Sequence, residues 1–269
     1  MYDKSSNETV GEIARKKFPY ILPEDKVTRI REIMRETGWR IVPVINREDE
    51  MKLIGVVYRL DILNVSSGRS DLLARDVMNE PPLVLSAENS PSQSVARMIE
   101  CDEWYVPVVG ENMRIIGIFG LEDFIRHELG KGATERLDIR VIEACTREVE
   151  YLNVEDEISR AWYLMLKRKY AGFPVVKDEM RLVGVLTQHD LLKKGYARVE
   201  LESESRPRRV KVKEVMTTPA ISVPEEATLL DAAKIIVGHD IGRVYIVDDK
   251  KRLIGVIDRE DIAKKLIGR

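Results

Sequence analysis

One short motif recurs four times along the chain and limits what the chain can fold into. Each copy begins with a glycine, at position 55, 117, 184 or 255, and ends with an aspartate six residues later. In the third copy, Gly184 to Asp190, apolar residues end a strand and the aspartate opens a helix. Because internal repetition of this kind specifies repeated structural units, we expect four copies of one supersecondary unit.

The segments around the motif repeat as well. The four glycines are separated by 62, 67 and 71 residues, and the four aspartates by the same intervals. A short apolar segment and a polar turn precede each glycine, which predicts hairpins whose first strands lie at 41–45, 106–109, 173–176 and 244–247. Apolar residues at helical spacing precede each hairpin, and Gly38 and Gly238 are expected to stop two of these helices.

A further short strand is indicated before the helix, most clearly at 215–223. Each unit is therefore expected to run strand, helix, strand, strand, helix. A unit of about 55 residues buries little core alone, so the units should pack in pairs. Polar or glycine-containing connectors at 64–74, 127–136 and 193–213 support this pairing, and we divide the chain near residue 130.

Composition narrows the class of protein. The chain has 269 residues, of which 44% are apolar and 33% charged, and this suits one large or two ordinary domains. A net charge of −2 favours neither nucleic acid nor an acidic membrane, and two cysteines provide no zinc spacing. The polar start and the absence of long apolar segments predict a soluble, cytoplasmic protein. The many charged residues indicate a heat-adapted source or compositional drift.

The four motif copies, in register over nearly the whole chain, resemble the cystathionine β-synthase (CBS) domain family. The resemblance implies an α+β fold (α/β-type CBS-domain pairs) of four βαββα repeats arranged as two tandem Bateman modules. Two modules can form a flat disc, as in the γ subunit of AMP-activated protein kinase. We place the first module at 1–129, with repeats at about 8–65 and 74–129, and the second at 130–269, with repeats at about 138–195 and 210–269.

In this family, clefts between paired repeats bind adenosine-containing ligands. The family motif is Gly, two apolar residues, Thr or Ser, two variable residues and Asp, and only the third copy matches it fully, through Gly184, Thr187 and Asp190. A carboxylate can accept two hydrogen bonds from a ribose diol, each worth about 1.5–3 kcal/mol, and a threonine hydroxyl can donate to a phosphate oxygen. The alternative is that Asp190 only caps the following helix.

Other expected site residues lie on the walls of the clefts. The strand edge at 170–174 would offer backbone groups to an adenine edge, and the segment 146–150 would form another wall. His189 either faces a phosphate or is an ordinary surface histidine. Besides the three motif residues, the expected nucleotide-binding residues are Thr146, Val149, Gly172, Phe173, Pro174, His189, Ile221, Arg243, Asp258 and Asp261.

The fourth copy carries a second carboxylate, because Asp258 stands where the family has Thr or Ser. Asp258 and Asp261 would repel a phosphate unless a cation such as Arg243 compensated, whereas S-adenosylmethionine or a nucleoside would be accepted. Alternatively, Asp258 is a solvated turn residue and Asp261 still holds ribose. Arg243 and Arg259 are either cations of this cleft or solvated surface residues.

The first two copies depart further from the family motif. Tyr58 is bulky enough to plug its cleft, and Gly120 provides no hydroxyl, although Asp61 and Asp123 remain. These two repeats either bind ligand or only scaffold the disc. Aromatic residues at 39, 104 and 105 either stack on a base or pack in the core.

The favoured hypothesis is a stand-alone regulatory protein that senses AMP, ADP or ATP. The alternatives are a sensor of S-adenosylmethionine, a ligand-free scaffold, and a nucleic-acid-binding protein that uses the cations at 206–213, a segment better interpreted as a solvated linker. No nucleophile set, metal-ligand spacing or P-loop occurs, so no enzyme, metal or catalytic cofactor is expected. The disc would close within one chain or form from a homodimer, with a regulated protein as partner.

Overall fold

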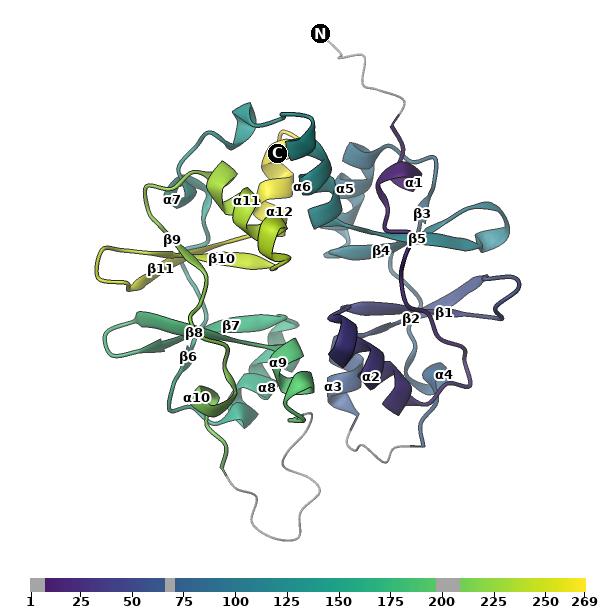
Figure 1. The fold of residues 1–269 in the computed structure, drawn as a ribbon, viewed down its shortest axis with the longest axis horizontal. Helices are drawn as coiled ribbons and strands as arrows, with labels where there is room; N and C mark the ends of the chain where they lie inside the picture. The colour runs from purple at the N-terminus through teal and green to yellow at the C-terminus, as the bar shows by residue number, and fades with distance from the viewer. Residues whose placement is uncertain (1–7, 66–70, 197–208) are drawn as a thin grey trace.

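The computed structural model describes residues 8–65, 71–196 and 209–269. Within them, four similar repeats surround a common centre (Figure 1). The first and second repeats form one half of the molecule, the third and fourth form the other half, and the sheets of each half face one another. The predicted α+β class is confirmed.

The repeats have the same order of elements. The first contains α2 (Val27–Thr37), β1 (Ile41–Ile45), β2 (Leu53–Tyr58) and α3 (Arg59–Asn64). The second contains β3 (Leu85–Ser86), α5 (Pro91–Glu100), β4 (Tyr105–Val109), β5 (Ile115–Gly120) and α6 (Leu121–Gly130). The third contains β6 (Leu152–Asn153), α8 (Ile158–Arg168), β7 (Gly172–Lys177), β8 (Arg181–Thr187) and α9 (Gln188–Lys193). The fourth contains β9 (Ser222–Pro224), α11 (Leu229–His239), β10 (Arg243–Val247), β11 (Leu253–Asp258) and α12 (Arg259–Leu266).

A short helix precedes each repeat, and the hairpins share one register. The short helices are α1 (Val10–Ile13), α4 (Ala74–Val77), α7 (Val141–Ala144) and α10 (Val212–Val215). Short 3-10 helices lie at η1 (Glu111–Met113) and η2 (Glu135–Leu137). Three sheets have a parallel pair followed by an antiparallel hairpin, whereas in the first repeat a single bridge from Ile21 to Val44 replaces the parallel strand. The motif glycine lies opposite Val44, Val108, Val175 or Ile246, and a register shift follows in every hairpin.

Two predicted boundaries differ from the structure. The strand expected at 215–223 is reduced to β9, because Thr217 instead forms a bridge with Val185 of the third repeat. Gly238 does not stop the fourth-repeat helix, since α11 continues to His239 and Asp240, at φ 50°, follows it. Gly38, at φ 75°, ends α2 as predicted.

Each repeat packs against two others. The helices of the first and third repeats share one apolar core, and those of the second and fourth share another. Smaller clusters lie between the sheets, with Ile41 and Ile118 in one half and Val176 and Tyr245 in the other. The predicted division at 129/130 lies in the last turn of α6 and stays a prediction. None of the described helices has both the length and the apolar character that a membrane span requires.

Candidate functional site

Each motif strand is met by a segment from the neighbouring repeat of the same half. The backbone of one residue in that segment forms a pair of N–H···O bonds of 2.8–3.1 Å with the motif strand. These crossing residues are Arg15 (opposite Ile118), Asn79 (opposite Val56), Thr146 (opposite Val256) and Thr217 (opposite Val185). Arg15 precedes the first repeat but pairs with the second, and Asn79 precedes the second repeat but pairs with the first. The two repeats of a half therefore exchange the segments that precede them.

The crossing segments explain the glycine of the motif. A Cβ atom on Gly184 would lie 2.7 Å from the carbonyl oxygen of Thr217. Gly55, Gly117 and Gly255 are approached in the same way by the crossing segments of their own clefts. Gly184 lines neither of the cavities described below, and the backbone that it allows to approach is that of Thr217, so a ligand contact at this glycine stays a prediction.

The motif aspartate caps the following helix in all four repeats. Asp190 Oδ2 accepts hydrogen bonds from the backbone N–H of Thr187 at 2.8 Å and from its hydroxyl at 2.6 Å. The carboxylates of Asp61, Asp123 and Asp261 each accept an equivalent backbone N–H bond at 2.9–3.0 Å. Capping is therefore common to the four copies, and the clefts differ in what else contacts the carboxylate.

The crossing residue contributes a second donor in three clefts. The Asn79 amide donates to Asp61 at 2.9 Å, Arg15 Nε donates to Asp123 at 2.8 Å, and the Thr217 hydroxyl donates to Asp190 at 2.7 Å. In the fourth cleft, the Asp258 N–H is the only hydrogen-bond donor to Asp261 among the described residues. The Asp261 carboxylate is therefore the least engaged of the four.

Asp258 and Asp261 share the fourth cleft and are both half-buried. Asp258 Oδ1 accepts from the backbone N–H groups of Glu260 and Asp261, at 2.9 and 3.2 Å, so Asp258 caps α12 rather than standing as a solvated turn residue. Burial raises the pKa of Asp258, while the charge of Arg243 opposes this. Burial and the neighbouring Asp258 raise the pKa of Asp261 to about 7.

In the first cleft, the hydroxyl of the motif tyrosine is hydrogen-bonded to another side chain of the protein. Tyr58 lines the large cavity described below, and its hydroxyl donates to Glu103 at 2.9 Å. Burial raises the pKa of Glu103 to about 7 and raises the pKa of Tyr58 above its ordinary value. The hydroxyl therefore points to a carboxyl group of the second repeat instead of offering a donor to the cleft.

Two cavities meet at the centre of the molecule. The large cavity, of about 760 Å³, is lined by all four repeats, and the small cavity has a volume of about 430 Å³. Arg40, Arg59, Tyr105, Ala171, Arg243 and Tyr245 line both. Of the expected site residues, the large cavity is lined by Thr146, Val149, Phe173, Pro174, Arg243 and Asp258. The small cavity is lined by Gly172, Thr187, His189, Ile221 and Arg243, whereas Gly184, Asp190 and Asp261 line neither.

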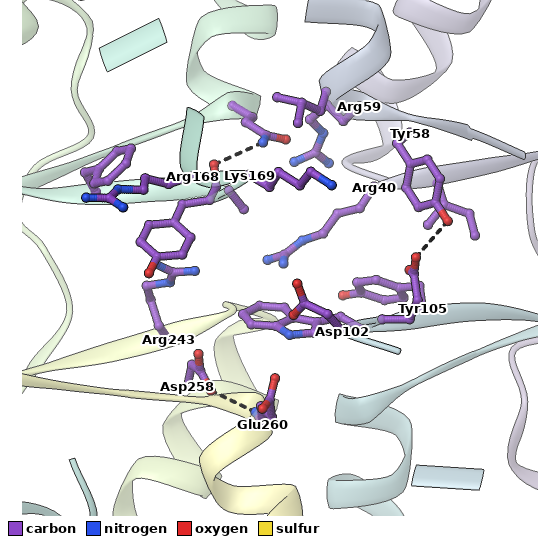
Figure 2. A pocket seen from close by; sticks show the side chains of 18 of the residues that line it. Arg40, Tyr58, Arg59, Asp102, Tyr105, Arg168, Lys169, Arg243, Asp258 and Glu260 are labelled. Carbon is purple, nitrogen blue, oxygen red and sulfur yellow. Dashed lines mark hydrogen bonds between the residues drawn. The ribbon is translucent and has the colours of Figure 1, made fainter. Parts of the chain in front are cut away.

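Arg40 occupies the middle of the large cavity (Figure 2). Its guanidinium carbon lies 5.1 Å from the ring centroid of Trp104 and 5.7 Å from that of Tyr105. Burial lowers the pKa of Arg40, and no carboxylate in the described part of the chain lies within ion-pair distance of it. Aromatic faces therefore hold this cation, and none of the described residues forms an ion pair with it.

Arg59 and His189 each have one buried nitrogen without a hydrogen-bond partner beside the small cavity. Arg59 is 5% exposed and donates to the carbonyls of Gly38 and Trp39, but its Nε has no hydrogen-bond partner. Burial, and then the charge of Arg40, lower the pKa of Arg59 to about 9. His189 Nδ1 is also buried without a partner, and its pKa is lowered first by burial and then by Arg59. The unpartnered N–H of the Arg59 guanidinium suits an anion.

Sequence reasoning missed Arg40 and Arg59, although it named Arg243 and Arg259 as possible cations of the fourth cleft. Arg59 and Arg259 directly follow the variable motif residue in the first and fourth copies, and this coincidence was a signal available in the sequence. Arg259 is 1% exposed and forms a 2.9 Å ion pair with Glu122, so the surface interpretation of Arg259 is wrong. The guanidinium of Arg243 donates to the Gly172 carbonyl at 3.1 Å.

The cations of the connector are paired where the structure describes them. Lys211 and Lys213 both form ion pairs with Glu155, and Arg209 forms one with Glu157. Positions 206–208 lie outside the described residues. This pairing supports the interpretation of the segment as a solvated linker rather than a nucleic-acid contact.

Comparisons with known proteins agree with this fold. The family model of the CBS domain matches residues 10–68, 74–130, 140–196 and 212–268. The uncharacterized protein MJ1404 of Methanocaldococcus jannaschii is 30% identical over 96% of this chain, which spans only 62% of the length of MJ1404. MJ1225 of the same organism is 24% identical over 93% of this chain and 95% of its own length.

Two solved structures share the whole architecture. The crystal structure of MJ1225, proposed to be an archaeal homologue of γ-AMPK, has a TM-score of 0.82 at 23% identity and covers 96% of this chain and 99% of its own. An uncharacterized conserved protein from Pyrococcus horikoshii has a TM-score of 0.65 at 22% identity, over 96% of this chain and 100% of its own. At these identities the likeness is one of fold.

Proposed function

The chain belongs to the CBS-domain family, and on that premise we propose that it is a regulatory protein that senses AMP, ADP or ATP in the clefts of its third and fourth repeats. The observation that carries the proposal is the pair of central arginines, Arg40 and Arg59, which line both cavities and have no carboxylate partner among the described residues. A bound phosphate would supply the missing acceptors and the missing negative charge.

In the third cleft, the ribose end of the ligand would contact Asp190. This carboxylate accepts bonds from Thr187 and Thr217, and because a carboxylate has about four acceptor positions, a ribose diol can bind beside them or replace the Thr217 hydroxyl. Thr187 and His189 line the small cavity together with Arg59, so a phosphate chain extended from this ribose would reach the central cations.

In the fourth cleft, Asp261 is the ribose acceptor, and Arg243 is the cation whose charge offsets that of Asp258. Thr146, Val149 and Asp258 line the large cavity around it. The two carboxylates of this cleft favour a second candidate there, S-adenosylmethionine, whose sulfonium and ammonium groups would be attracted where a phosphate is repelled.

The proposed mechanism is a shift between relative orientations of the repeats. The small cavity is lined by residues of the first and third repeats, such as Arg59 and Thr187, so a nucleotide bound there would contact both halves of the molecule. A ligand that contacts both halves stabilises one orientation over others, and a partner protein would recognise that orientation. The proposal involves no enzymatic step. The proposed homology of MJ1225 with γ-AMPK is consistent with such a role.

The test is isothermal titration calorimetry of the full chain with AMP, ADP, ATP and S-adenosylmethionine. Asp190→Ala removes two charge-assisted bonds to ribose and should weaken the third-cleft nucleotide by at least about 100-fold, while Asp261→Ala should act on the fourth cleft alone. Asp61→Ala, which removes an equivalent cap from the first cleft, is the matched control and should leave affinity unchanged. Binding of none of the four compounds, or an equal loss in Asp61→Ala, would contradict the proposal.

A further inference from the structure

The second cleft is filled by a side chain of the protein itself. Arg15 crosses from the N-terminal segment to the motif strand of the second repeat, where its backbone pairs with Ile118 at 2.8 and 3.1 Å. Its Nε donates to Asp123 at 2.8 Å, and its terminal nitrogen contacts Glu122. The crossing residues of the other three clefts are the short side chains Asn79, Thr146 and Thr217, so an arginine stands at this place in one cleft only.

Arg15 makes the two kinds of contact that an adenosyl group needs in such a cleft. Its charged end binds the motif aspartate, as a ribose diol would, and its flat guanidinium lies 5.5 Å from the ring centroid of Trp39, as a base would. Its side chain is 26% exposed and lines the small cavity, so the space that it fills is continuous with the cavity next to Thr187.

The charges of the second repeat explain why the occupant is a cation. Glu122 and Asp123 are adjacent, buried carboxylates. Glu122 also pairs with Arg259 at 2.9 Å, whereas Asp123 is contacted by Arg15 and, at 3.2 Å, by the exposed end of Arg126. A phosphate would be repelled by these two carboxylates, so the group that can replace Arg15 is a neutral ribose rather than a nucleotide phosphate.

We propose that Arg15 is a built-in ligand of the second repeat, which holds the adenosyl position of this cleft closed, and that removal of its side chain converts the cleft into a binding site for adenosine. This inference rests on the proposed function only in the choice of an adenosyl probe. It predicts that the intact chain takes no ligand in the second cleft, although the motif aspartate is present.

The experiment measures the number of adenosine molecules bound per full-length chain by calorimetry. Arg15→Ala should bind one more adenosine than the wild-type chain, and the double variant Arg15→Ala/Asp123→Ala should lose the added site. Arg126→Ala is the matched control, since it also removes a cation from Asp123 but leaves Arg15 in the cleft, and it should bind as the wild type does. AMP should bind the added site at least 10-fold more weakly than adenosine.

A folded Arg15→Ala chain with wild-type stoichiometry would overturn the inference, and so would an added site that survives the Asp123 substitution. Arg15→Gln keeps a hydrogen-bond donor for Asp123 but is too short to cover Trp39, and it tests the same gain if the alanine variant does not fold. Guanidinium ions added at millimolar concentration should compete with adenosine for the added site. If the wild-type chain binds none of AMP, ADP, ATP and S-adenosylmethionine while Arg15→Ala binds adenosine, the proposed function fails and this inference stands.

Discussion

The two halves of the molecule meet at two places, and these are built from the same motif positions with different charges. Where α6 meets α12, buried Arg259 pairs with Glu122, which is 0% exposed, and with Asp240 at 3.1 Å. Where α3 meets α9, Arg59 occupies the motif position of Arg259, but the motif position of Glu122 is held by His189. One contact brings together opposite charges, whereas the other holds an arginine that has no carboxylate partner among the described residues.

On the proposed function, the α6–α12 contact is structural and the α3–α9 contact belongs to the ligand site. A buried ion pair stabilises only when both partners are present, so the α6–α12 contact should keep its geometry whatever ligand is bound. The α3–α9 contact keeps Arg59 Nε buried without an acceptor, and a phosphate at the small cavity would remove this cost. Ligand binding should therefore tighten the α3–α9 contact selectively.

Removing the carboxylate of the completed pair should have the largest effect. Glu122→Ala leaves Arg259 buried without its main counter-charge, and we expect the free energy of unfolding, measured by urea denaturation, to fall by about 3–5 kcal/mol. Glu260→Ala removes a half-buried acid at the start of α12, paired with Lys264, and should cost under about 1 kcal/mol. Equal losses in the two variants would refute the structural assignment of the α6–α12 contact.

Arg59→Leu should weaken ATP binding and leave the ligand-free fold largely intact. Loss of a charged donor to phosphate is worth about 1.5–3 kcal/mol, which corresponds to roughly a 10- to 100-fold rise in Kd by calorimetry. The change in unfolding free energy should be smaller than that of Glu122→Ala, since the bonds lost to carbonyls are offset by removal of a buried cation. A variant that unfolds as readily as Glu122→Ala but binds ATP normally would reverse our assignment of the two contacts.

His189→Glu should make the second contact resemble the first. A carboxylate at this position would give Arg59 the partner that Glu122 gives Arg259, so the ligand-free chain should gain about 1 kcal/mol of stability in urea denaturation. The same substitution should weaken ATP binding, because the added carboxylate takes the place of the phosphate. His189→Gln, which adds no charge, is the control, and a similar gain in stability from the glutamine would show that charge is not the cause.

We expect the smallest effect in the pH dependence of folding stability, through Asp261 of the fourth cleft. Because the folded pKa of Asp261 is raised to about 7, the folded chain binds this proton more tightly than the unfolded chain. The contribution of the protonated Asp261 to folding stability is therefore complete below the unfolded pKa near 4 and is lost as the pH rises to about 7. Asp261→Asn should flatten the pH dependence of the melting temperature between pH 4.5 and 7.5 and stabilise the chain by about 1 kcal/mol at pH 7.5. An unchanged pH profile would show that Asp261 titrates normally.

The family and the α+β fold were predictable because their signals are local. A glycine, two apolar residues and an aspartate at fixed spacing recur with the same strands and helices around them, and sequence alone shows this. The aspartates at 190 and 261, and the residues at 187 and 258, were likewise singled out by comparing copies. Whether they contact a nucleotide stays a prediction.

What the sequence determined by itself was therefore the repeated unit, its elements and the four motif positions. Tertiary structure decided which side chains of different repeats meet. Arg15 reaches Asp123 across 108 positions, and Arg40 and Arg59 become central only when four repeats close around them. Such contacts produce no recurring pattern in the sequence, because they depend on how whole repeats pack and exchange segments. For that reason, the same motif position holds an ion-paired arginine in the fourth repeat, Arg259, and an arginine without a carboxylate partner among the described residues in the first, Arg59.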